Sequence, residues 1–226
     1  MSHVTVVMVS GLGGDGRLFE PQRSLPWPIL AVDWIEPLPR ESLAAYAQRL
    51  AQRVKVAPPF FLGGVSMGGM IALEMSRWLH PEAVFLIASG RSRRAIAPLW
   101  RLLARAVGLV PLSFAPAAAA LVRAFSPAGG ELNSEQRKFC WQMANATPPS
   151  FVRWGCGAAA TWEGIDLPRV PVHHIHGDCD RIMPVSRVNP DRVVHGGGHM
   201  INLTHADQVN AYLTDRIAAH LDRTTG

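Results

Sequence analysis

Short apolar runs alternate with longer amphipathic segments along most of the chain. Runs of this length, rich in β-branched residues and bounded by glycine or proline, are typical of strands buried on both faces. The segments between them repeat apolar residues every three or four positions, as one face of a helix does. This alternation predicts an α/β fold with a mostly parallel central sheet and helices on both of its faces. The expected strands are Val4–Val9, Ile29–Trp34, Phe60–Val65, Ala83–Ala88, Val170–His176 and Arg192–His195.

Three segments are expected to form helices that pack on this sheet. Ser42–Lys55 places apolar side chains at spacings of four, three and four, beginning with Leu43, and a pair of prolines follows it. Met67–Leu79 comes directly after a predicted strand. In the last segment, from about His205 to Leu221, an apolar residue returns at every fourth position.

Residues 91–167 interrupt this alternation of strands and helices. They contain no convincing strand, but apolar residues recur at helical spacing from Ile96 to Val107, and prolines divide the segment. We therefore expect a core made of residues 1–90 and 168–226, with residues 91–167 inserted as a helical cap. The insertion would lie over the carboxyl ends of the strands, where open α/β sheets bind their ligands.

The composition is that of a folded domain. Of the 226 residues, 48% are hydrophobic and 17% are charged, which allows a sizeable core and excludes global disorder. No apolar run approaches the roughly 18–20 residues that span a bilayer, and the apolar start lacks the basic leader and cleavage site of a signal peptide. We expect a cytoplasmic protein without a membrane partner. The three cysteines have the spacing of neither a disulfide framework nor a zinc site.

The net charge of +5 comes from 22 basic and 17 acidic residues, and nearly all the basic residues are arginine. A nucleic-acid surface would concentrate these arginines, but most are scattered, so we expect no nucleic-acid partner. One local cluster has two interpretations: a solvated surface, which we favour, or a docking site for an acidic carrier such as a carrier protein or coenzyme A. Its members are Arg91, Arg93, Arg94, Arg101 and Arg105.

Ser66 is the first candidate catalytic residue, and it lies in the sequence Gly64-Val65-Ser66-Met67-Gly68. It lies between a predicted strand and a predicted helix. In G-x-S-x-G at such a junction, the serine occupies a sharp, strained turn that presents its hydroxyl above the sheet. The helix that follows points its positive end toward a developing oxyanion. A chance match is the alternative in a chain with 20 glycines, but the strand–helix context favours a nucleophile.

A serine nucleophile needs a histidine that takes its proton and a carboxylate that orients the histidine. The loop after the fifth predicted strand offers two aspartates. The order Gly-x-x-Asp-x-x-x-Pro selects Asp180 over Asp178, for which a turn role is the alternative. His199 follows three glycines after the last strand. We predict it as the general base, ahead of His195 in the strand and His205 at the start of a helix.

The glycine-rich loop after the first strand has two interpretations. Gly11, Gly13 and Gly16 match the dinucleotide-binding string G-x-G-x-x-G, but the acidic residue expected about 20 positions later is present only loosely, as Asp33 or Glu36. A loop whose backbone N–H faces an oxyanion fits better with the turn at Ser66.

The histidines at positions 173, 174 and 176 raise the question of a metal site. On a strand, His174 and His176 share one face and His173 lies on the other. No carboxylate or cysteine pattern accompanies them, so we interpret them as strand residues. We expect neither a metal nor an organic cofactor.

Together these motifs resemble the α/β-hydrolase fold superfamily, in the branch of small serine esterases that includes the carboxylesterase of biotin biosynthesis and its relatives. The resemblance covers nearly the whole chain, from Gly11–Gly14 through Gly64–Gly69 and Gly177–Pro184 to His199. A serine nucleophile argues against the haloalkane dehalogenase and epoxide hydrolase branches, which have an aspartate there.

The resemblance also implies further roles. The backbone N–H groups of Leu12 and Met67 would form the oxyanion hole, and the inserted cap would select the substrate. Ser10 stands where the family usually has a histidine, so the loop is expected to be held differently. Four apolar cap residues are candidates either for lining an acyl pocket or for packing the cap onto the core: Trp100, Leu103, Phe114 and Phe125.

The expected reaction is therefore the hydrolysis of a carboxylic ester of a small or medium-sized molecule. Ser66 would form an acyl-enzyme, His199 would move the protons and Asp180 would orient the histidine. The alternatives are a thioesterase that acts on a carrier-bound acyl group and a non-enzymatic binding protein on the same fold.

Overall fold

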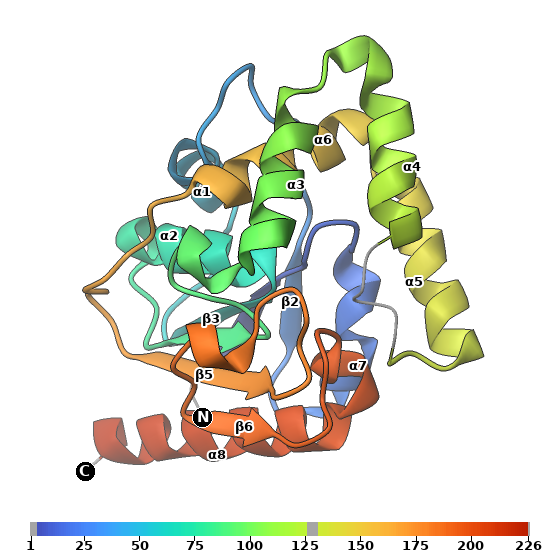
Figure 1. Cartoon of the computed structure of the whole chain (residues 1–226). Coiled ribbons are helices and arrows are strands. Elements are labelled where there is room, and N and C mark those ends of the chain that lie inside the picture. The colour runs from blue at the N-terminus through green and yellow to red at the C-terminus, as the bar shows by residue number, and fades with distance from the viewer. Residues whose placement is uncertain (1–3, 126–130, 226) are drawn as a thin grey trace.

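A parallel sheet organises the protein. The computed structural model describes residues 4–125 and 131–225, and the side chains of all of these except 123–125 and 224–225. Within these residues the strands have the order β2-β1-β3-β4-β5-β6, and each neighbouring pair is parallel (Figure 1). The strands are β1 (Thr5–Val9), β2 (Ile29–Val32), β3 (Phe60–Val65), β4 (Val84–Ile87), β5 (Val172–Gly177) and β6 (Arg192–Val194).

Helices cover both faces of this sheet. Successive strand residues point to opposite faces, so Val7 packs with α1 and α2 in one hydrophobic cluster, whereas Val6 packs with α7, α8 and the 3-10 segment η1 in the other. Figure 1 shows α8 on the opposite side of the sheet from α1 and α2. The predicted α/β sheet is thus confirmed. These elements are η1 (Gly16–Ser24), α1 (Leu43–Ala51), α2 (Met67–Leu79), α7 (Ile201–Thr204) and α8 (Ala206–Thr225).

Element bounds depart from the predicted ones where local hydrogen bonding changes. Strand β3 and helix α2 have the predicted bounds, and most other strands are one or two residues shorter. Strand β5 begins only after Pro171, which has no N–H for the ladder, although its carbonyl accepts from Val84. Helix α1 ends at Ala51, and after Gln52 the amides of Arg53 and Val54 bond only three residues back, to Leu50 and Ala51.

Residues 91–167 form helices and turns wherever the structure describes them. Helix α6 packs against α1 and α2, and α3 and α4 pack against α6. The backbones of α3 and α6 touch where Gly108 faces Gly157: a Cβ atom on Gly108 would lie 2.5 Å from the Cα of Gly157. The division into a core and a separate cap stays a prediction. The segments are η2 (Arg93–Ala95), α3 (Pro98–Leu109), η3 (Leu112–Phe114), α4 (Ala115–Phe125), α5 (Ser134–Ala146) and α6 (Pro149–Thr161).

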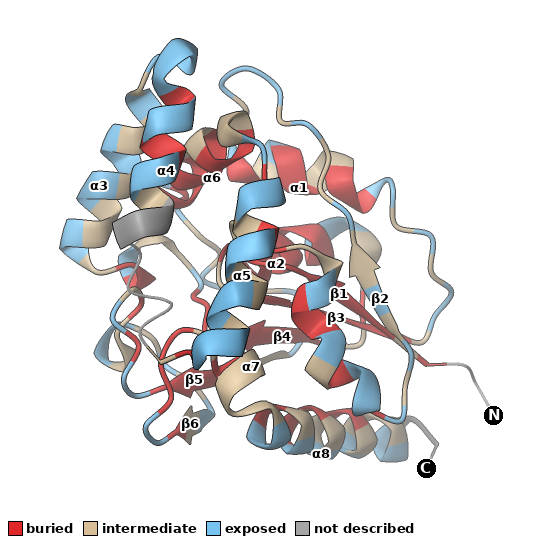
Figure 2. Ribbon diagram, turned by 90° about the vertical axis from the view of Figure 1, so that its right-hand side faces the viewer, coloured by how far each residue is buried: buried red, intermediate tan, exposed pale blue. Residues whose placement is uncertain are grey.

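Helix α3 turns apolar residues outward. Leu103 is 45% exposed and Phe114, in the following η3, is 63% exposed. Figure 2 shows that the outer faces of α3 and α4 consist mainly of exposed residues. Leu103 and Phe114 therefore do not pack onto the core, and a role for them in lining an acyl pocket stays a prediction. Trp100 does pack against the core, and the side chain of Phe125 lies outside the described residues.

Within the described ranges, none of the helices is by itself long and apolar enough to cross a membrane. Among the described helices, only Pro98–Leu109 taken together with Leu112–Val122 has the required length and composition, and that pair is bent by 116°.

Candidate active site

Ser66 lies at the junction of β3 and α2 in a backbone conformation that residues other than glycine rarely adopt. Its φ is 55° and its ψ is −126°, and such strained residues persist only where the surrounding structure holds them. The amide of Ser66 donates to the carbonyl of Ile87 at 3.0 Å, and the hydroxyl of Ser89 donates to the carbonyl of Ser66 at 2.6 Å. Contacts from β4 and the loop after it therefore fix the turn.

The glycines of the motif let the strand and the helix approach each other. A Cβ atom on Gly68 would lie 2.1 Å from the carbonyl oxygen of Val9, and one on Gly64 would lie 2.4 Å from the carbonyl carbon of Gly68. Both distances are far shorter than van der Waals contact, and the opposing atoms are backbone. Close packing of the strand against the helix therefore requires glycine at both positions.

Three predicted site residues form one hydrogen-bonded chain. Nε2 of His199 lies 2.8 Å from Oγ of Ser66, and Nδ1 of His199 lies 2.7 Å from Oδ2 of Asp180. Since a carboxylate only accepts, Nδ1 carries the hydrogen, and Nε2 of the neutral ring is left to accept from the serine. Ser66 follows β3, Asp180 follows β5 and His199 follows β6, so the chain joins loops at the carboxyl ends of three strands.

Asp180 is buried and accepts hydrogen bonds at both of its carboxylate oxygens. Oδ1 accepts from the amides of Ile182 (2.8 Å) and Met183 (2.9 Å), and Oδ2 lies 3.2 Å from Nε2 of His176. Burial alone would raise the pKa of Asp180, but the charge of His199 and the hydrogen bonds from His176, His199 and Met183 outweigh it and lower the pKa. The side chain is therefore a carboxylate at neutral pH.

His176 is the part of this network that the sequence analysis did not assign to the site. Its ring is fully buried, and Nε2 lies 2.7 Å from the carbonyl oxygen of Met183, so Nε2 must carry a hydrogen. Nδ1 lies 3.0 Å from Nε2 of His174, which therefore donates. Burial first, and then the neighbouring His176, lower the pKa of His174 to about 3. The signal available in the sequence was two histidines on one strand face, directly before the loop of Asp180.

Glu131 is a second residue that no motif indicated. Its carboxylate accepts from the backbone amides of Gly198 and Met200, on either side of His199. Burial lowers the pKa of His199, but the charge and hydrogen bond of Asp180, and then the charge of Glu131, outweigh burial and raise the pKa above its ordinary value of 6.5. Glu131 thus holds the loop that carries His199 and contributes to the raised pKa of His199.

The alternative acid and base lie apart from this chain. Oδ2 of Asp178 lies 2.9 Å from Nδ1 of His195, whose side chain is 90% exposed, and the amide of Gly196 donates to Oδ1 of Asp178. This pair closes a surface turn. His205, the third histidine considered, ends α7 and contacts the hydroxyl of Thr204.

The glycine loop after β1 lies against Ser66. A Cβ atom on Gly11 would be 3.3 Å from the Cβ of Ser66. The side chains of Leu12 and Met67 meet at α6, because a Cβ atom on Gly155 would lie 2.6 Å from Cδ1 of Leu12 and 3.1 Å from Sδ of Met67. The structure therefore brings together the two residues that the resemblance named for the oxyanion hole.

Ser10 accounts for how this loop is held without the family's histidine. The Ser10 hydroxyl donates to the carbonyl of Gly14 at 3.0 Å, and the indole N–H of Trp34 donates to the same oxygen at 2.9 Å. The amide of Gly14 donates to Gly11 at 2.9 Å and closes the turn. A buried hydroxyl and an indole thus fix the loop conformation.

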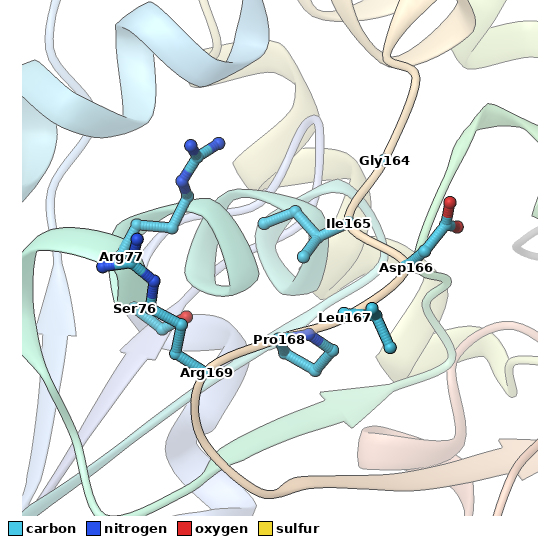
Figure 3. Close-up of a pocket in the computed structure, with 8 residues that line it drawn as sticks. All are labelled: Ser76, Arg77, Gly164, Ile165, Asp166, Leu167, Pro168 and Arg169. Carbon is cyan, nitrogen blue, oxygen red and sulfur yellow. The ribbon is translucent and has the colours of Figure 1, made fainter.

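Two cavities differ in their relation to Ser66. One of about 190 Å³ lies beside the glycine loop, between Gly14, Trp34 and Phe151. The other, of about 270 Å³, lies between Arg77, near the end of α2, and residues 164–169 (Figure 3). Because a helix rises about 1.5 Å per residue, the second cavity lies about 15 Å along α2 from Ser66. Gly14 connects the first cavity to the glycine loop that lies against Ser66, but the residues that line this cavity do not include Ser66, Asp180 or His199.

Comparison with known proteins gives matches in sequence and in structure. The family model described as "Alpha/beta hydrolase family" matches residues 6–212. A thermophilic esterase from Thermogutta terrifontis superposes with a TM-score of 0.77 at 16% identity, over 96% of this chain and 90% of that one. The enol-lactonase from Burkholderia xenovorans superposes with a TM-score of 0.73 at 18% identity, over 96% of this chain and 92% of that one.

One curated relative matches a shorter stretch. The protein named "Putative non-heme chloroperoxidase" from Synechocystis sp. is 48% identical over 60 residues. These cover 21% of this chain and 22% of that protein, so the chain spans about a fifth of the length of this relative.

Proposed function

The chain belongs to the alpha/beta hydrolase family, and on this premise we propose that it is a serine hydrolase that cleaves a carboxylic ester of a small or medium-sized molecule. The observation that supports this proposal is the hydrogen-bonded chain from Ser66 through His199 to Asp180, with both contacts under 3 Å. A neutral histidine oriented by a buried carboxylate is the arrangement that activates a serine hydroxyl.

The proposed reaction has two halves. Nε2 of His199 takes the proton of Ser66 as Oγ attacks the ester carbonyl carbon, and the N–H groups of Leu12 and Met67 donate to the oxyanion. The imidazolium, stabilised by Asp180, then protonates the departing alcohol. Water then loses a proton to His199 and attacks the acyl carbon on Ser66. The bond from that carbon to Oγ breaks, His199 returns the proton to Oγ, and the carboxylic acid leaves.

We place one arm of the ester in the 190 Å³ cavity beside the glycine loop. Trp34 and Phe151 give this cavity apolar walls, so a short apolar arm suits it. Residues 91–167 are proposed to be the cap that selects the substrate, since Gly155 of α6 lies directly against Leu12 and Met67.

The proposed function is tested by a panel of p-nitrophenyl esters of increasing acyl length, together with a fluorophosphonate probe. We expect turnover that is highest on short esters, and a single covalent label that peptide mapping assigns to Ser66. Heat-denatured protein, which lacks the folded turn, serves as the control. A label on another serine, or no turnover on any ester of the panel, would refute the proposal.

We expect kcat/KM for ester hydrolysis to fall in acid with a midpoint above pH 6.5. Only neutral His199 accepts the proton of Ser66, and Asp180 and Glu131 together raise the pKa of His199 above 6.5 despite its burial. The neutral base therefore predominates only above this raised pKa, and the rate climbs with pH through it. Steady-state kinetics from about pH 5 to pH 9 measure the midpoint.

Glu131→Gln provides the matched variant for this profile. It removes a charge that raises the pKa of His199 but keeps an amide oxygen for the loop, so the midpoint should move toward lower pH. Glu135→Gln, an exposed carboxyl on α5, should leave the midpoint unchanged. Equal midpoints in all three proteins would show that Glu131 does not influence the base.

We expect His176 to act as a positioning residue for Asp180. His176→Phe removes the N–H that faces Oδ2 of Asp180 while keeping an aromatic ring, so kcat should fall about ten- to a hundredfold. A hydrogen bond to a charged group contributes about 1.5–3 kcal/mol, and about 1.4 kcal/mol corresponds to a factor of ten in rate. KM should change little because the ring does not face the substrate.

Two further variants separate positioning from folding in this test. His176→Gln retains an N–H donor and should recover part of kcat. His173→Gln changes the histidine on the opposite face of β5, next to Asp191, and should leave kcat as in the parent. If His176→Phe lowers thermal stability but not kcat, the positioning role is wrong.

A further inference from the structure

Helix α3 presents an apolar stripe to solvent. Leu99, Leu102 and Leu109 are 62%, 65% and 76% exposed, and their spacing places them on one side of the helix. The opposite side packs on α6 through Gly108. Helix α3 is therefore apolar on both sides, and none of its residues is buried.

Further exposed apolar side chains lie in η3 and α4. Exposed fractions there are 65% for Leu112, 63% for Phe114 and 59% for Leu121. Helices α3 and α4 both pack on α6 and lie at the end of the molecule away from α8 (Figure 2). We call these side chains the α3–α4 face. Its members are Leu99, Leu102, Leu103, Leu109, Leu112, Phe114 and Leu121.

The positive charge of the chain is concentrated in the same segment. Residues 91–130 contain six arginines and no aspartate or glutamate, which leaves 16 basic and 17 acidic residues in the rest of the chain. The net charge of +5 therefore comes from this segment, and the rest is nearly neutral. Arg101 and Arg105 lie one turn apart on α3, beside the apolar stripe, and neither forms an ion pair with a described residue.

We propose that the α3–α4 face docks on the surface of an anionic lipid bilayer. Amphipathic helices with leucine and phenylalanine on one side and arginine beside them insert their apolar side chains at the boundary of headgroups and acyl chains, while the arginines remain at the phosphates. The expectation of no membrane partner rested on the lack of a spanning segment, and a helix that lies in the interface needs none.

Other partners fit this face less well. Specific protein interfaces carry about one hydrogen bond per 100–200 Å², but in residues 98–122 the polar side chains are only Arg101, Arg105 and Ser113. A second copy in a twofold contact would bring the same arginines toward each other. Nucleic acid would leave the leucines in water. Lipid tails require no hydrogen bonds, and anionic headgroups match the arginines.

The test is sedimentation of the full-length protein with vesicles. We expect it to sediment with phosphatidylcholine vesicles that contain about one third phosphatidylglycerol, and at least tenfold more weakly with pure phosphatidylcholine, because each basic residue near an anionic surface adds to the affinity. Added salt should weaken binding to the mixed vesicles. Equal binding to both vesicle types, or no binding to either, overturns the proposal.

Matched variants locate the contact. The double variant Leu102→Gln, Leu109→Gln should weaken binding about tenfold or more, and Arg101→Glu, Arg105→Glu should abolish the preference for phosphatidylglycerol. The controls are Leu167→Gln, at a leucine that is 90% exposed elsewhere, and Arg53→Glu; both should bind like the parent. Variants of the face that bind like the parent would refute the assignment of the surface.

Two readouts distinguish this inference from misfolding and from other partners. All of these side chains are exposed or half-exposed, so thermal unfolding and the circular dichroism spectrum should be unchanged in the variants. Light scattering reports self-association. The parent could instead be a dimer that does not sediment with vesicles and that the leucine variants convert to a monomer. In that case the α3–α4 face is an interface between two copies, and the lipid proposal is wrong.

Discussion

Replacement of Ser66 by alanine is expected to lower kcat for ester hydrolysis by roughly 10⁴–10⁶. The variant removes Oγ, the atom 2.8 Å from Nε2 of His199, and leaves a histidine with no nucleophile to activate. The fold should persist, since the main-chain contacts of the turn to Ile87 and Ser89 do not involve the removed atom. Steady-state kinetics on a short p-nitrophenyl ester and circular dichroism measure the two expectations.

Two matched variants complete this experiment. Ser76→Ala removes a buried hydroxyl from the same helix, one that donates to the carbonyl of Leu73, and should retain activity. Ser66→Gly should be as inactive as alanine but more stable than it by about 1 kcal/mol, because glycine adopts a φ of 55° without strain. If Ser66→Ala were as active as the parent, Ser66 could not be the nucleophile, and another residue would have to be.

The placement of the candidate site could be predicted because each of its residues follows a strand. The carboxyl ends of parallel strands meet at one edge of the sheet, so loops after neighbouring strands are brought together whatever their separation in sequence. Ser66, Asp180 and His199 all have this position, and the structure places them within hydrogen-bond distance. Their catalytic roles stay predictions that the variants above test.

Residues that act through long-range contacts gave little signal in the sequence. Glu131 stands outside every motif, and its carboxylate contacts the amide of Gly198, 67 positions later, only through the tertiary packing of the chain. His176 looked like any strand histidine, because strand periodicity reveals the face of a side chain but not which loop closes over it. Its contact with Asp180 depends on the turn that follows β5.

Helix α3 is another element whose tertiary contacts the sequence pattern does not reveal. Apolar periodicity shows that Leu99 and Leu103 share one side of a helix. It does not show whether that side meets the core or solvent, and here it meets solvent. The packing of α3 on α6 is determined instead by the facing glycines, Gly108 and Gly157, whose missing side chains let the two backbones touch. The apolar pattern therefore predicted the helix correctly but did not show which of its sides meets solvent.

Gly68→Ala is expected to have the largest effect on stability, lowering the free energy of unfolding by roughly 3 kcal/mol or more. The added Cβ would lie 2.1 Å from the carbonyl oxygen of Val9 and 2.2 Å from that of Ser10. Both are backbone atoms and cannot rotate away, so α2 has to move from the end of β1. Urea unfolding monitored by tryptophan fluorescence measures the loss.

Movement of α2 away from β1 should also lower activity, because the displaced atoms of Val9 and Ser10 lie at the start of the loop that carries Leu12. Protein that remains folded should therefore also lose kcat. Gly196→Ala is the informative control: its φ is 74° but nothing lies within 4 Å of the new Cβ, so it should cost only about 1 kcal/mol for the backbone conformation. If Gly68→Ala were no more destabilising than Gly196→Ala, the close approach of α2 to β1 could not be what holds Ser66 in its turn.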